Sequence, residues 1–433
     1  MDMTASIEEI RKGQLALLQR HLGYLNQASP FYRARFAASG FDPAGLTSLD
    51  QLAQLPLTDK SDLTLHNRDF LAVGEEQVVD ICQTSGTTGE PVAFWQTEAD
   101  LQRLTTNEQL AFTTAGITRH DRVLIGAALD RAFMAGLAYF LGLRQIGATV
   151  IRSGSGQLML VAEFIRRYRP NVLVGVPSLF LALGRKLQEG GDDPTRQGVE
   201  KLICIGEPVR NPDLSLAPLG QALAETWRAQ VLGTYASTEM ATSFSDCPCG
   251  CGGHLLPELM VVEIVDEQGR PVAPGEAGEV VATPLGIEGT PLLRYRTGDI
   301  ASLHHKPCAC GRQTPRIGPV LGRRAHMLKC RGTTLFPAAI GSALLTLPEV
   351  QGHYLEVYRE FDLSDRLRVV VGTRSSELSP ELVGEVIAAK TRVKPEVVLC
   401  TPEQIQHQTI RPDRRKPVTF FDYRQQPVKD TCQ

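Results

Sequence analysis

The stretch DRVLIGAALDRAFMAGLAYFLGLRQIGATVIR, residues 121–152, decides the fold class of this chain. Its apolar residues predict a strand over 123–128, a helix over 133–146 and a second strand over 149–152. A strand, a helix and a strand in this order predict parallel strands with the helix packed on the sheet. The stretch therefore predicts an α/β protein.

The same alternation continues downstream. The predicted strands are 172–176, 201–205 and 231–235, and the predicted helices are 158–168, 179–188 and 219–227. In a largely parallel sheet covered by helices, ligands bind at the loops that leave the carboxyl ends of the strands. We therefore expect the functional motifs at those loops.

The flanking regions differ in character. Leucines at helical spacing predict a helix over 15–25, which Ser29 and Pro30 end. Strands are predicted at 259–265, 279–283, 350–358 and 367–371, and a further helix at 378–391. We expect a large N-terminal domain, residues 1–323, with mixed and parallel sheets and a β subdomain, and a small α+β C-terminal domain, residues 324–433.

Composition excludes several function classes. The 433 residues are 42% hydrophobic and 21% charged, which is typical of a soluble globular protein. A net charge of −3 gives no broad attraction to nucleic acid or to an anionic membrane, and charged residues interrupt the apolar runs well short of a membrane span. We expect a cytoplasmic protein with no nucleic acid and no membrane among its partners.

A glycine- and hydroxyl-rich loop follows the apolar run 78–82. Residues 83–91 read QTSGTTGEP. Glycine tolerates positive φ and has no Cβ, so such a loop can turn its N–H groups toward an anion while its hydroxyls add donors. The sequence predicts a polyphosphate site here, and the alternative is an ordinary solvated turn.

Four short motifs follow in order. They are GEP at 206–208, YASTE at 235–239, YRTGD at 295–299 and GR at 322–323, and the first two come directly after predicted strands. Each motif alone is weak, since Glu239 is compatible with an acid at a helix N-terminus and Asp299 with a solvated turn acid.

Together with TSGTTGEP and in this order, the motifs resemble the adenylate-forming superfamily, which activates carboxylates with ATP. Within it, the chain is most similar to the phenylacetate–coenzyme A ligase group. The likeness begins at SPFYR, residues 29–33, and LPLTDKSDL, residues 55–63, and extends to RGTTLFP, residues 331–337. The resemblance therefore covers nearly the whole chain.

The resemblance implies a set of ATP-binding residues. The phosphate loop would comprise Thr84, Ser85, Gly86, Thr87, Thr88 and Gly89; the adenine and phosphate contacts would come from Gly206, Glu207, Pro208, Tyr235, Ala236, Ser237 and Thr238. Glu239 would bind the Mg²⁺ ion, Asp299 both ribose hydroxyls, and Arg323 would add positive charge near ribose or phosphate.

The resemblance also implies the reaction. A carboxylic acid, ATP, Mg²⁺ and coenzyme A would give an acyl adenylate and then a thioester, with the C-terminal domain mobile about a hinge at 324–326. Phe133, Tyr139 and Phe140 suit an aryl or medium apolar acid, although residues at this spacing also suit a simple core. A second copy of the chain, forming a homodimer, is a further candidate partner.

The chain departs from the family pattern at two places. An acidic hinge residue is replaced by His326, and the adenylation lysine near the C-terminus by Arg414, with Lys416 two residues later. Arginine differs from lysine in shape and reach, so Arg414 and Lys416 are both candidates for the catalytic cation. The altered tail leaves two alternatives open: an adenylating enzyme that passes the acyl group to an amine, and a nucleotide-binding homologue that acts as a partner or regulator.

Five of the ten cysteines lie in two short clusters. CPCGCGGH spans residues 247–254, and CACGR spans 308–312. Thiolates and an imidazole with tight glycine turns predict a tetrahedral structural zinc site, for which free surface thiols are the alternative. The resemblance favours Cys247, His254, Cys308 and Cys310 as ligands, with Cys249 a close competitor for Cys247.

Overall fold

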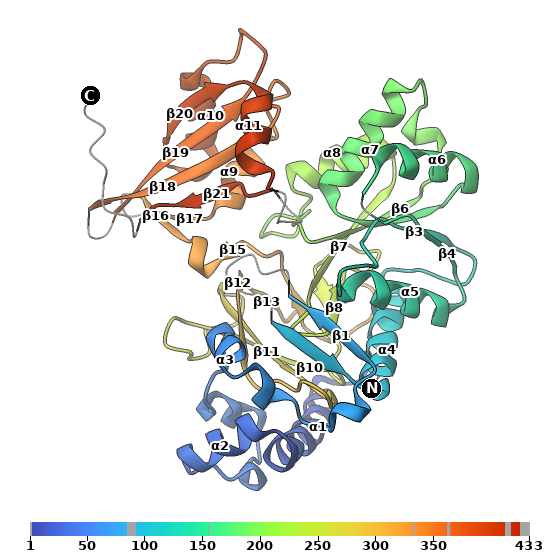
Figure 1. The fold of residues 1–433 in the computed structure, drawn as a ribbon, viewed down its shortest axis with the longest axis vertical. Coiled ribbons are helices and arrows are strands. Elements are labelled where there is room, and N and C mark those ends of the chain that lie inside the picture. Colours follow the sequence, from blue (N-terminus) through green and yellow to red (C-terminus); the bar gives the residue numbers. More distant parts are fainter. Residues whose placement is uncertain are drawn as a thin grey trace. The chain divides into compact units, whose positions relative to one another are not determined.

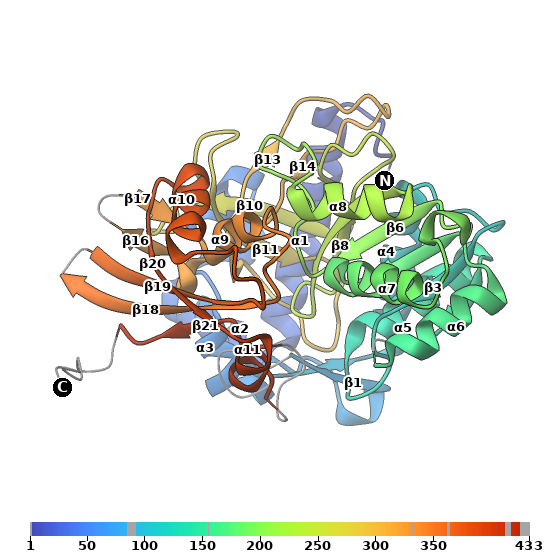
Figure 2. The same ribbon diagram turned by 90° about the horizontal axis from the view of Figure 1, so that it is seen from above.

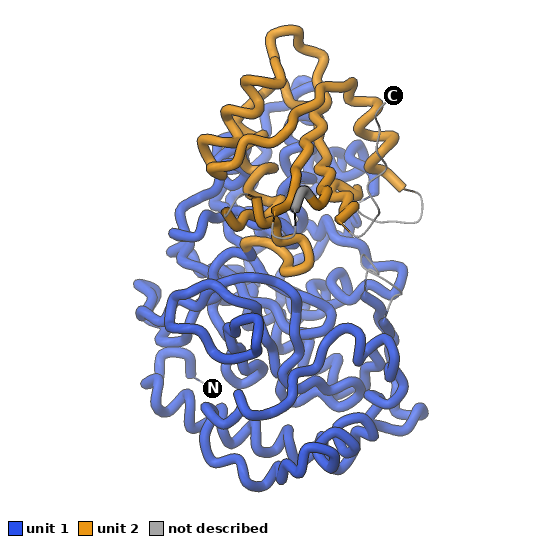
Figure 3. Tube along the Cα trace, turned by 90° about the vertical axis from the view of Figure 1, so that its left-hand side faces the viewer, with its two compact units in different colours: residues 1–320 blue, residues 321–433 orange. Residues whose placement is uncertain are grey.

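The computed structural model describes residues 2–84, 92–154, 156–330, 333–361, 364–411 and 417–424. The chain forms two compact units, residues 1–320 and residues 321–433 (Figure 3). This division places Arg323 in the second unit, whereas the sequence-based boundary placed it in the first domain. In the described part of the chain, no helix combines the length and apolarity needed to cross a membrane.

A mixed sheet forms the centre of the α/β region of the first unit (Figure 1). Its strand order is β4-β3-β5-β6-β7-β8, in which β8 is antiparallel to β7 and the other neighbours are parallel. The strands are β3 (Arg122–Ile125), β4 (Thr149–Arg152), β5 (Val172–Gly175), β6 (Lys201–Ile205), β7 (Gln230–Ser237) and β8 (Thr242–Ser245). The predicted parallel α/β sheet is confirmed.

Helices cover both faces of this sheet because side chains alternate along each strand. Leu124, Leu173 and Leu202 pack with α6 (Leu158–Tyr168), α7 (Pro177–Glu189) and α8 (Pro218–Trp227), which form one row of helices (Figure 2). Ile125, Val174 and Ile203 face the other way, toward α4 (Glu98–Thr114) and α5 (Met134–Ile146).

The rest of the first unit is helical at its start and β-rich at its end. It contains α1 (Ile7–Ala28), α2 (Pro30–Ser39), α3 (Lys60–Leu65), the hairpin β1 (Asp80–Gln83) and β2 (Ala93–Gln96), the antiparallel strands β10 (Met260–Val265), β11 (Gly278–Pro284) and β12 (Tyr295–Ala301), and a small sheet of β9 (Gly253–His254), β13 (Leu303–His304) and β14 (Arg316–Ile317). The β subdomain expected after residue 258 is therefore present.

The second unit is an α+β structure, as predicted. Its main sheet has the order β20-β19-β18-β21, where β18 and β19 form an antiparallel hairpin. Its elements are β15 (Gly322–Arg323), β16 (Leu328–Cys330), β17 (Thr333–Leu335), α9 (Pro337–Leu344), β18 (His353–Phe361), β19 (Ser364–Gly372), α10 (Pro380–Thr391), β20 (Glu396–Cys400), α11 (Pro402–Thr409) and β21 (Phe420–Asp422).

Several predicted element boundaries were wrong. The first helix begins at Ile7 rather than near residue 15, because Ser6 and Glu9 form a capping box. The strand predicted over 350–358 begins only at His353, since Gly352 has φ +107° and the Val350 N–H donates back to the Leu347 carbonyl. The first strand of the α/β region ends at Ile125 instead of continuing to residue 128.

Candidate active site

Two of the motifs lie at the same edge of the central sheet. Gly206 follows β6 directly, and Tyr235 lies near the end of β7. These parallel strands pair with Ile205 opposite Thr234, so the residues after both strands emerge side by side. Gly206 has φ +76°, a conformation that favours glycine and turns the chain immediately after the strand.

Tyr235 and Asp299 are joined by a hydrogen bond. The Tyr235 hydroxyl donates to Asp299 Oδ2 at 3.0 Å, and the Asp299 N–H donates to Thr297 Oγ1 at 3.1 Å. Asp299 is only 7% exposed. The contact brings β12 to the end of β7, so an aromatic ring and a carboxylate that are 64 positions apart share one location.

Glu239 lies at the same place and is half-buried. The buried Tyr295 of β12 donates its hydroxyl hydrogen bond to Glu239 Oε1 at 3.5 Å. The turn that carries Thr238 and Glu239 is held by a bond from the Met240 N–H to Ser237 Oγ at 3.3 Å. A carboxylate held in this way offers the hard oxygen ligand that Mg²⁺ prefers.

Arg103 supports the segment after Glu239. Its guanidinium is buried and donates to the carbonyl of Ala241 at 2.8 Å, to Thr242 Oγ1 at 3.1 Å, and to the carbonyls of Leu259 and Leu285, each at 2.6 Å. Burial lowers the pKa of Arg103 to about 10, so the group is charged at neutral pH. Sequence reasoning missed this residue. The usable signal was a charged residue, Arg103, among the positions of α4 that face the core.

The Glu207 carboxylate caps a helix. It accepts hydrogen bonds from the Ser178 N–H at 3.0 Å and the Ser178 hydroxyl at 2.9 Å, at the start of α7. Gly206 and Pro208, on either side, are exposed. The segment that was expected to line the adenine pocket is therefore fixed to α7 by its only charged side chain.

The start of the predicted phosphate loop is well anchored. The Thr84 N–H donates to the Val92 carbonyl, and the Val92 N–H donates to Thr84 Oγ1, both at 3.0 Å. The other predicted loop residues, Ser85, Gly86, Thr87, Thr88 and Gly89, lie outside the described residues, as do Arg414 and Lys416. Arg323 lies on β15 of the second unit, while Ala236 is exposed at the end of β7.

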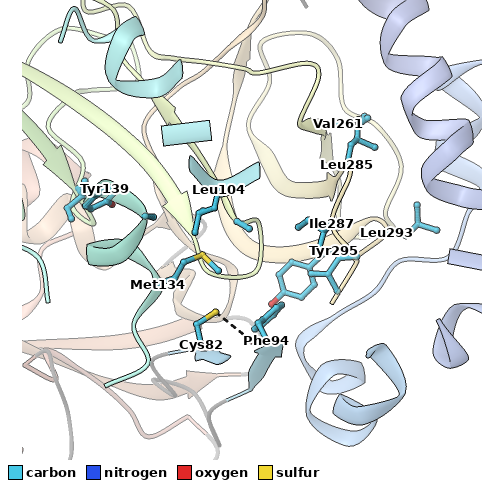
Figure 4. Close-up of a cluster of buried hydrophobic side chains, with 14 of the residues drawn as sticks. Cys82, Phe94, Leu104, Met134, Tyr139, Val261, Leu285, Ile287, Leu293 and Tyr295 are labelled. Atoms are coloured by element: carbon cyan, nitrogen blue, oxygen red, sulfur yellow. Dashed lines mark hydrogen bonds between the residues drawn. The ribbon is translucent and has the colours of Figure 1, made fainter. Parts of the chain in front are cut away.

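A cavity lies beside Thr238 and Glu239. Its apolar wall includes Phe94, Met134 and Ile287, and Gln96, Asp100 and Arg103 add polar groups. Figure 4 shows Phe94, Met134 and Ile287 within the buried apolar cluster that also contains Tyr295. Phe133, Tyr139 and Phe140 are absent from this lining; Tyr139 instead packs edge-on against Phe112 in the core.

Two cysteine clusters meet in a second location. One ligand atom each from Cys247, His254, Cys308 and Cys310 lies within 4.8 Å of all the others. β9 and β14 pair antiparallel, with His254 opposite Arg316, and β14 also pairs with β13, which brings the two clusters together. Cys249 is exposed and does not belong to this group.

The geometry of this group fits a tetrahedral metal ion. Zinc with bonds of roughly 2.3 Å to sulfur and 2.0 Å to nitrogen holds its ligand atoms about 3.5–3.8 Å apart. Cys247 Sγ and Cys308 Sγ are 3.6 Å apart, and Cys310 Sγ lies 3.5 Å from His254 Nε2. Burial, together with Arg312 and Arg316, lowers the pKa of His254 to about 4, so its imidazole is neutral and able to coordinate a metal.

Comparison with known proteins identifies relatives that match most of the chain. The family model for AMP-binding enzymes matches residues 38–286. The phenylacetate–coenzyme A ligase of Thermus thermophilus is 30% identical over 395 residues, which cover 89% of this chain and 87% of the relative. The phenylacetate–coenzyme A ligase of Escherichia coli is 30% identical over 382 residues, covering 87% and 85% of the two chains.

The fold also matches a solved structure. A crystal structure of 2-hydroxyisobutyryl-CoA ligase, in the postadenylation state and in complex with R3-HIB-AMP, superposes with a TM-score of 0.86. The match covers 97% of this chain and 90% of the other at 22% sequence identity. At this identity the likeness concerns the fold.

Proposed function

Because this chain belongs to the AMP-binding enzyme family, in its phenylacetate–coenzyme A ligase-like group, we propose that its substrate is an aryl or medium-sized apolar carboxylic acid. The enzyme is an AMP-forming acid–coenzyme A ligase. The carboxylate attacks the α-phosphorus of ATP, pyrophosphate leaves, and the thiol of coenzyme A then displaces AMP from the acyl adenylate.

One observation carries the proposed ATP site: the motifs YASTE and YRTGD meet at the carboxyl edge of the central sheet, where Gly206 also follows its strand. Tyr235 and Asp299 are joined directly, and Glu239 is joined to Tyr295 on the strand that carries Asp299. A ring that flanks the adenine and a carboxylate that accepts from both ribose hydroxyls must lie close together, since base and ribose are covalently linked. The pair formed by Tyr235 and Asp299 meets this requirement.

The phosphate end requires donors and a hard oxygen ligand. The proposal assigns Thr238 to the phosphates, and Thr84 through Gly89 to the β- and γ-phosphates. Glu239 is assigned to Mg²⁺, which when bound would neutralise charge that develops on the phosphate oxygens. Arg103 keeps Ala241 and Thr242 in place and thereby fixes the position of Glu239.

The acid requires space next to the phosphate site. Its carboxylate has to reach the α-phosphorus, so its side chain must extend away from Thr238 and Glu239. The cavity lined by Phe94, Met134 and Ile287 provides apolar walls at this position. We propose that the side chain of the acid enters between these residues, which as they stand enclose room for about one water molecule.

The second unit would complete the site with a cation. Lys416 and Arg414 both stay candidates for the residue that stabilises the adenylation transition state, and Arg323 stays a prediction for ribose or phosphate contact. We further propose that the second unit moves between the two half-reactions, with the hinge at Arg324–His326.

Zinc would serve as a structural ion. The donor set of Cys247, His254, Cys308 and Cys310 fits it by distance, and Thr314 Oγ1 lies 3.3 Å from His254 Nδ1, which orients the ring. Asp246, which accepts from Arg210 at 2.6 Å and from the Gly233 N–H at 2.9 Å, anchors the first cluster to β7.

Free cysteines and a thiolate site are typical of a reducing compartment, so we place the enzyme in the cytoplasm.

A product assay tests this function. The protein is incubated with ATP, Mg²⁺, coenzyme A and a panel of aryl and medium-chain acids, and acyl thioester and AMP are measured by mass spectrometry. We expect equal amounts of both, and neither product without the acid. Amide formation with added amines in place of thioester would contradict the assignment of the acceptor.

The same assay identifies the working cation. Lys416→Ala and Arg414→Ala are compared with wild type in the formation of AMP and pyrophosphate. Loss in Lys416→Ala alone would assign the role to Lys416, and loss in Arg414→Ala alone would assign it to Arg414. Full activity in both variants would contradict the proposal for this segment.

A further inference from the structure

Two motifs of the N-terminal region meet in the core. SPFYR spans residues 29–33 and contains the start of α2, and LPLTDKSDL spans residues 55–63 and leads into α3. The Tyr32 hydroxyl of the first motif and Thr58 Oγ1 of the second share a hydrogen bond of 2.9 Å, and both residues are buried. The two hydroxyls therefore join α2 to the segment before α3, at a place that the proposed ATP site does not include.

Backbone hydrogen bonds join Thr58 to both sides of Tyr295. The Thr58 N–H donates to the Arg294 carbonyl at 3.1 Å, and the Arg296 N–H donates to the Thr58 carbonyl at 2.8 Å. Thr58 and Tyr295 form a parallel bridge in this way, at the first residue of β12. The start of the strand that carries Asp299 is therefore fixed to Thr58.

The Tyr32 hydroxyl holds the chain two residues before Tyr295. It accepts from the Leu293 N–H at 2.8 Å, in addition to its bond with Thr58. The Tyr32 ring packs edge-on against Phe31 and Phe70, with ring centroids 5.1 and 5.6 Å away. Because these aromatic contacts fix the ring, they also fix its hydroxyl at the segment that leads into β12.

Arg294 has an unusual backbone conformation that its contacts maintain. Its φ is +45°, in the left-handed region that few residues other than glycine adopt. The buried guanidinium donates to the carbonyls of Ala53 and Leu55, and it pairs with Glu263 at 2.9 Å. A strained residue persists only where its surroundings determine its conformation, so the position of Tyr295 depends on these tertiary contacts.

Tyr295 connects this segment to the proposed Mg²⁺ ligand. Its hydroxyl donates to Glu239 Oε1 at 3.5 Å, which is at the long limit for a hydrogen bond. A small displacement of Tyr295 would therefore break this contact and leave the Glu239 carboxylate less firmly held. Leu293 and Tyr295 both belong to the apolar cluster of Figure 4, whose close packing limits such a movement.

We propose that Tyr32 and Thr58 are positioning residues for the adenylation step. Their paired hydroxyls set the position of Tyr295, and Tyr295 in turn holds the Glu239 carboxylate in place for the metal ion. This inference rests on the proposed function, because it takes Glu239 as the Mg²⁺ ligand.

Acid-dependent exchange of pyrophosphate into ATP tests the inference. The acid is phenylacetate or, where that is not a substrate, the aryl acid that gives the most thioester in the product assay. Tyr32→Phe keeps the ring but removes the acceptor of the Leu293 N–H. We expect kcat to fall by about tenfold and the KM for MgATP to rise by about fivefold, while the KM for the acid stays within about twofold of wild type.

Substitutions of Thr58 provide a second, independent route to the same test. Thr58→Val removes the partner of the Tyr32 hydroxyl but leaves the Leu293 N–H paired, so we expect a smaller loss of about threefold in kcat. Thr58→Ser keeps the hydroxyl and should behave as wild type. If Tyr32→Phe does not fold, this pair of variants carries the test.

Tyr24→Phe is the matched control. The Tyr24 hydroxyl, on α1, donates to the carbonyls of Ala72 and Glu288. The control therefore loses buried hydrogen bonds of the same kind, and its melting temperature is compared with that of Tyr32→Phe. It should keep the wild-type kcat and KM for MgATP, since a smaller folded fraction does not change KM.

A double-mutant cycle separates positioning from a general loss of stability. If Tyr32 acts through Tyr295, then Tyr32→Phe should change kcat and the KM for MgATP by less than about twofold in a Tyr295→Phe background. Equal factors in both backgrounds would overturn the inference.

The remaining outcomes distinguish this inference from the proposed function. Lower exchange in Tyr295→Phe, with wild-type values in Tyr32→Phe and Thr58→Val, overturns the inference alone and leaves the ATP site as proposed. Wild-type exchange in both Tyr295→Phe and Glu239→Gln contradicts the assignment of Glu239, and the inference falls with it.

Discussion

Asp299 combines charge, burial and a fixed orientation in one side chain. It is 7% exposed, and its Oδ2 accepts from the Tyr235 hydroxyl. Gly298, before it, has φ +75°, which allows the turn of the chain that directs the carboxylate toward β7. The sequence motif predicted an acid in contact with ribose, and the structure supplies its aromatic neighbour.

Replacing Asp299 by asparagine tests this placement at the residue scale. Asparagine keeps the size of the side chain but loses the negative charge, and hydrogen bonds to a charged acceptor contribute about 1.5–3 kcal/mol. We expect the KM for ATP to rise about tenfold to a hundredfold, with a smaller change in Tyr235→Phe. A KM for ATP within about twofold of wild type in Asp299→Asn would place the ribose elsewhere.

At the scale of elements, the contact between α4 and β8 contains a buried carboxyl group. Glu108 Oε1 accepts from the Ser243 hydroxyl at 2.9 Å, and Asn107 accepts from the Ser243 N–H at 3.0 Å. Burial raises the pKa of Glu108 to about 7, although the bond from Ser243 opposes this shift. α4 is thereby linked to the strand that begins three positions after Glu239.

This raised pKa predicts a pH-dependent stability. Between the ordinary value of 4.5 and about 7, the unfolded chain has released the Glu108 proton while the folded chain retains it, so stability falls as pH rises through this window and levels off above about 7. The loss is about 3 kcal/mol. The free energy of unfolding of wild type and of Glu108→Gln is measured with urea at a series of pH values. The difference between the two proteins should change by this amount between about pH 5 and about pH 8. Curves that stay parallel would show that Glu108 is ionised in the folded protein.

The small sheet of β9, β13 and β14 makes a second prediction, through the proposed zinc site. We expect about one zinc ion per chain by metal analysis, and much less in Cys310→Ser. Loss of the ion should lower the melting temperature by at least about 5 °C, because each kcal/mol lost from a large domain lowers it by roughly 2–4 °C. Cys249→Ser is the matched control, since Cys249 lies outside the cluster. Zinc loss in Cys249→Ser with retention in Cys310→Ser would contradict the ligand set.

At the scale of the whole molecule, the sequence predicted what depends on local pattern. Strands such as 201–205 and helices such as 158–168 were predicted with their observed bounds, because a buried strand and an amphipathic helix have clear periods. The motifs after β6 and β7 were located because parallel strands place such loops at one edge.

The sequence could not predict contacts between distant side chains. Arg103 gave no motif, since its role depends on the carbonyls of Ala241, Leu259 and Leu285, which lie 138 or more positions away along the chain. The aromatic residues Tyr139 and Phe140 suggested an acid pocket, but α5 turns Tyr139 into the core. Glu207 likewise gave no sign that it caps α7.

The most direct test of the account is acid-dependent exchange of labelled pyrophosphate into ATP, measured for wild type, Glu239→Gln and the exposed control Glu267→Gln. The account predicts exchange only when an acid is present, equal rates in wild type and Glu267→Gln, and a rate lower by at least about a hundredfold in Glu239→Gln. Unchanged exchange in Glu239→Gln, or ATP binding without exchange for every acid in wild type, would contradict it.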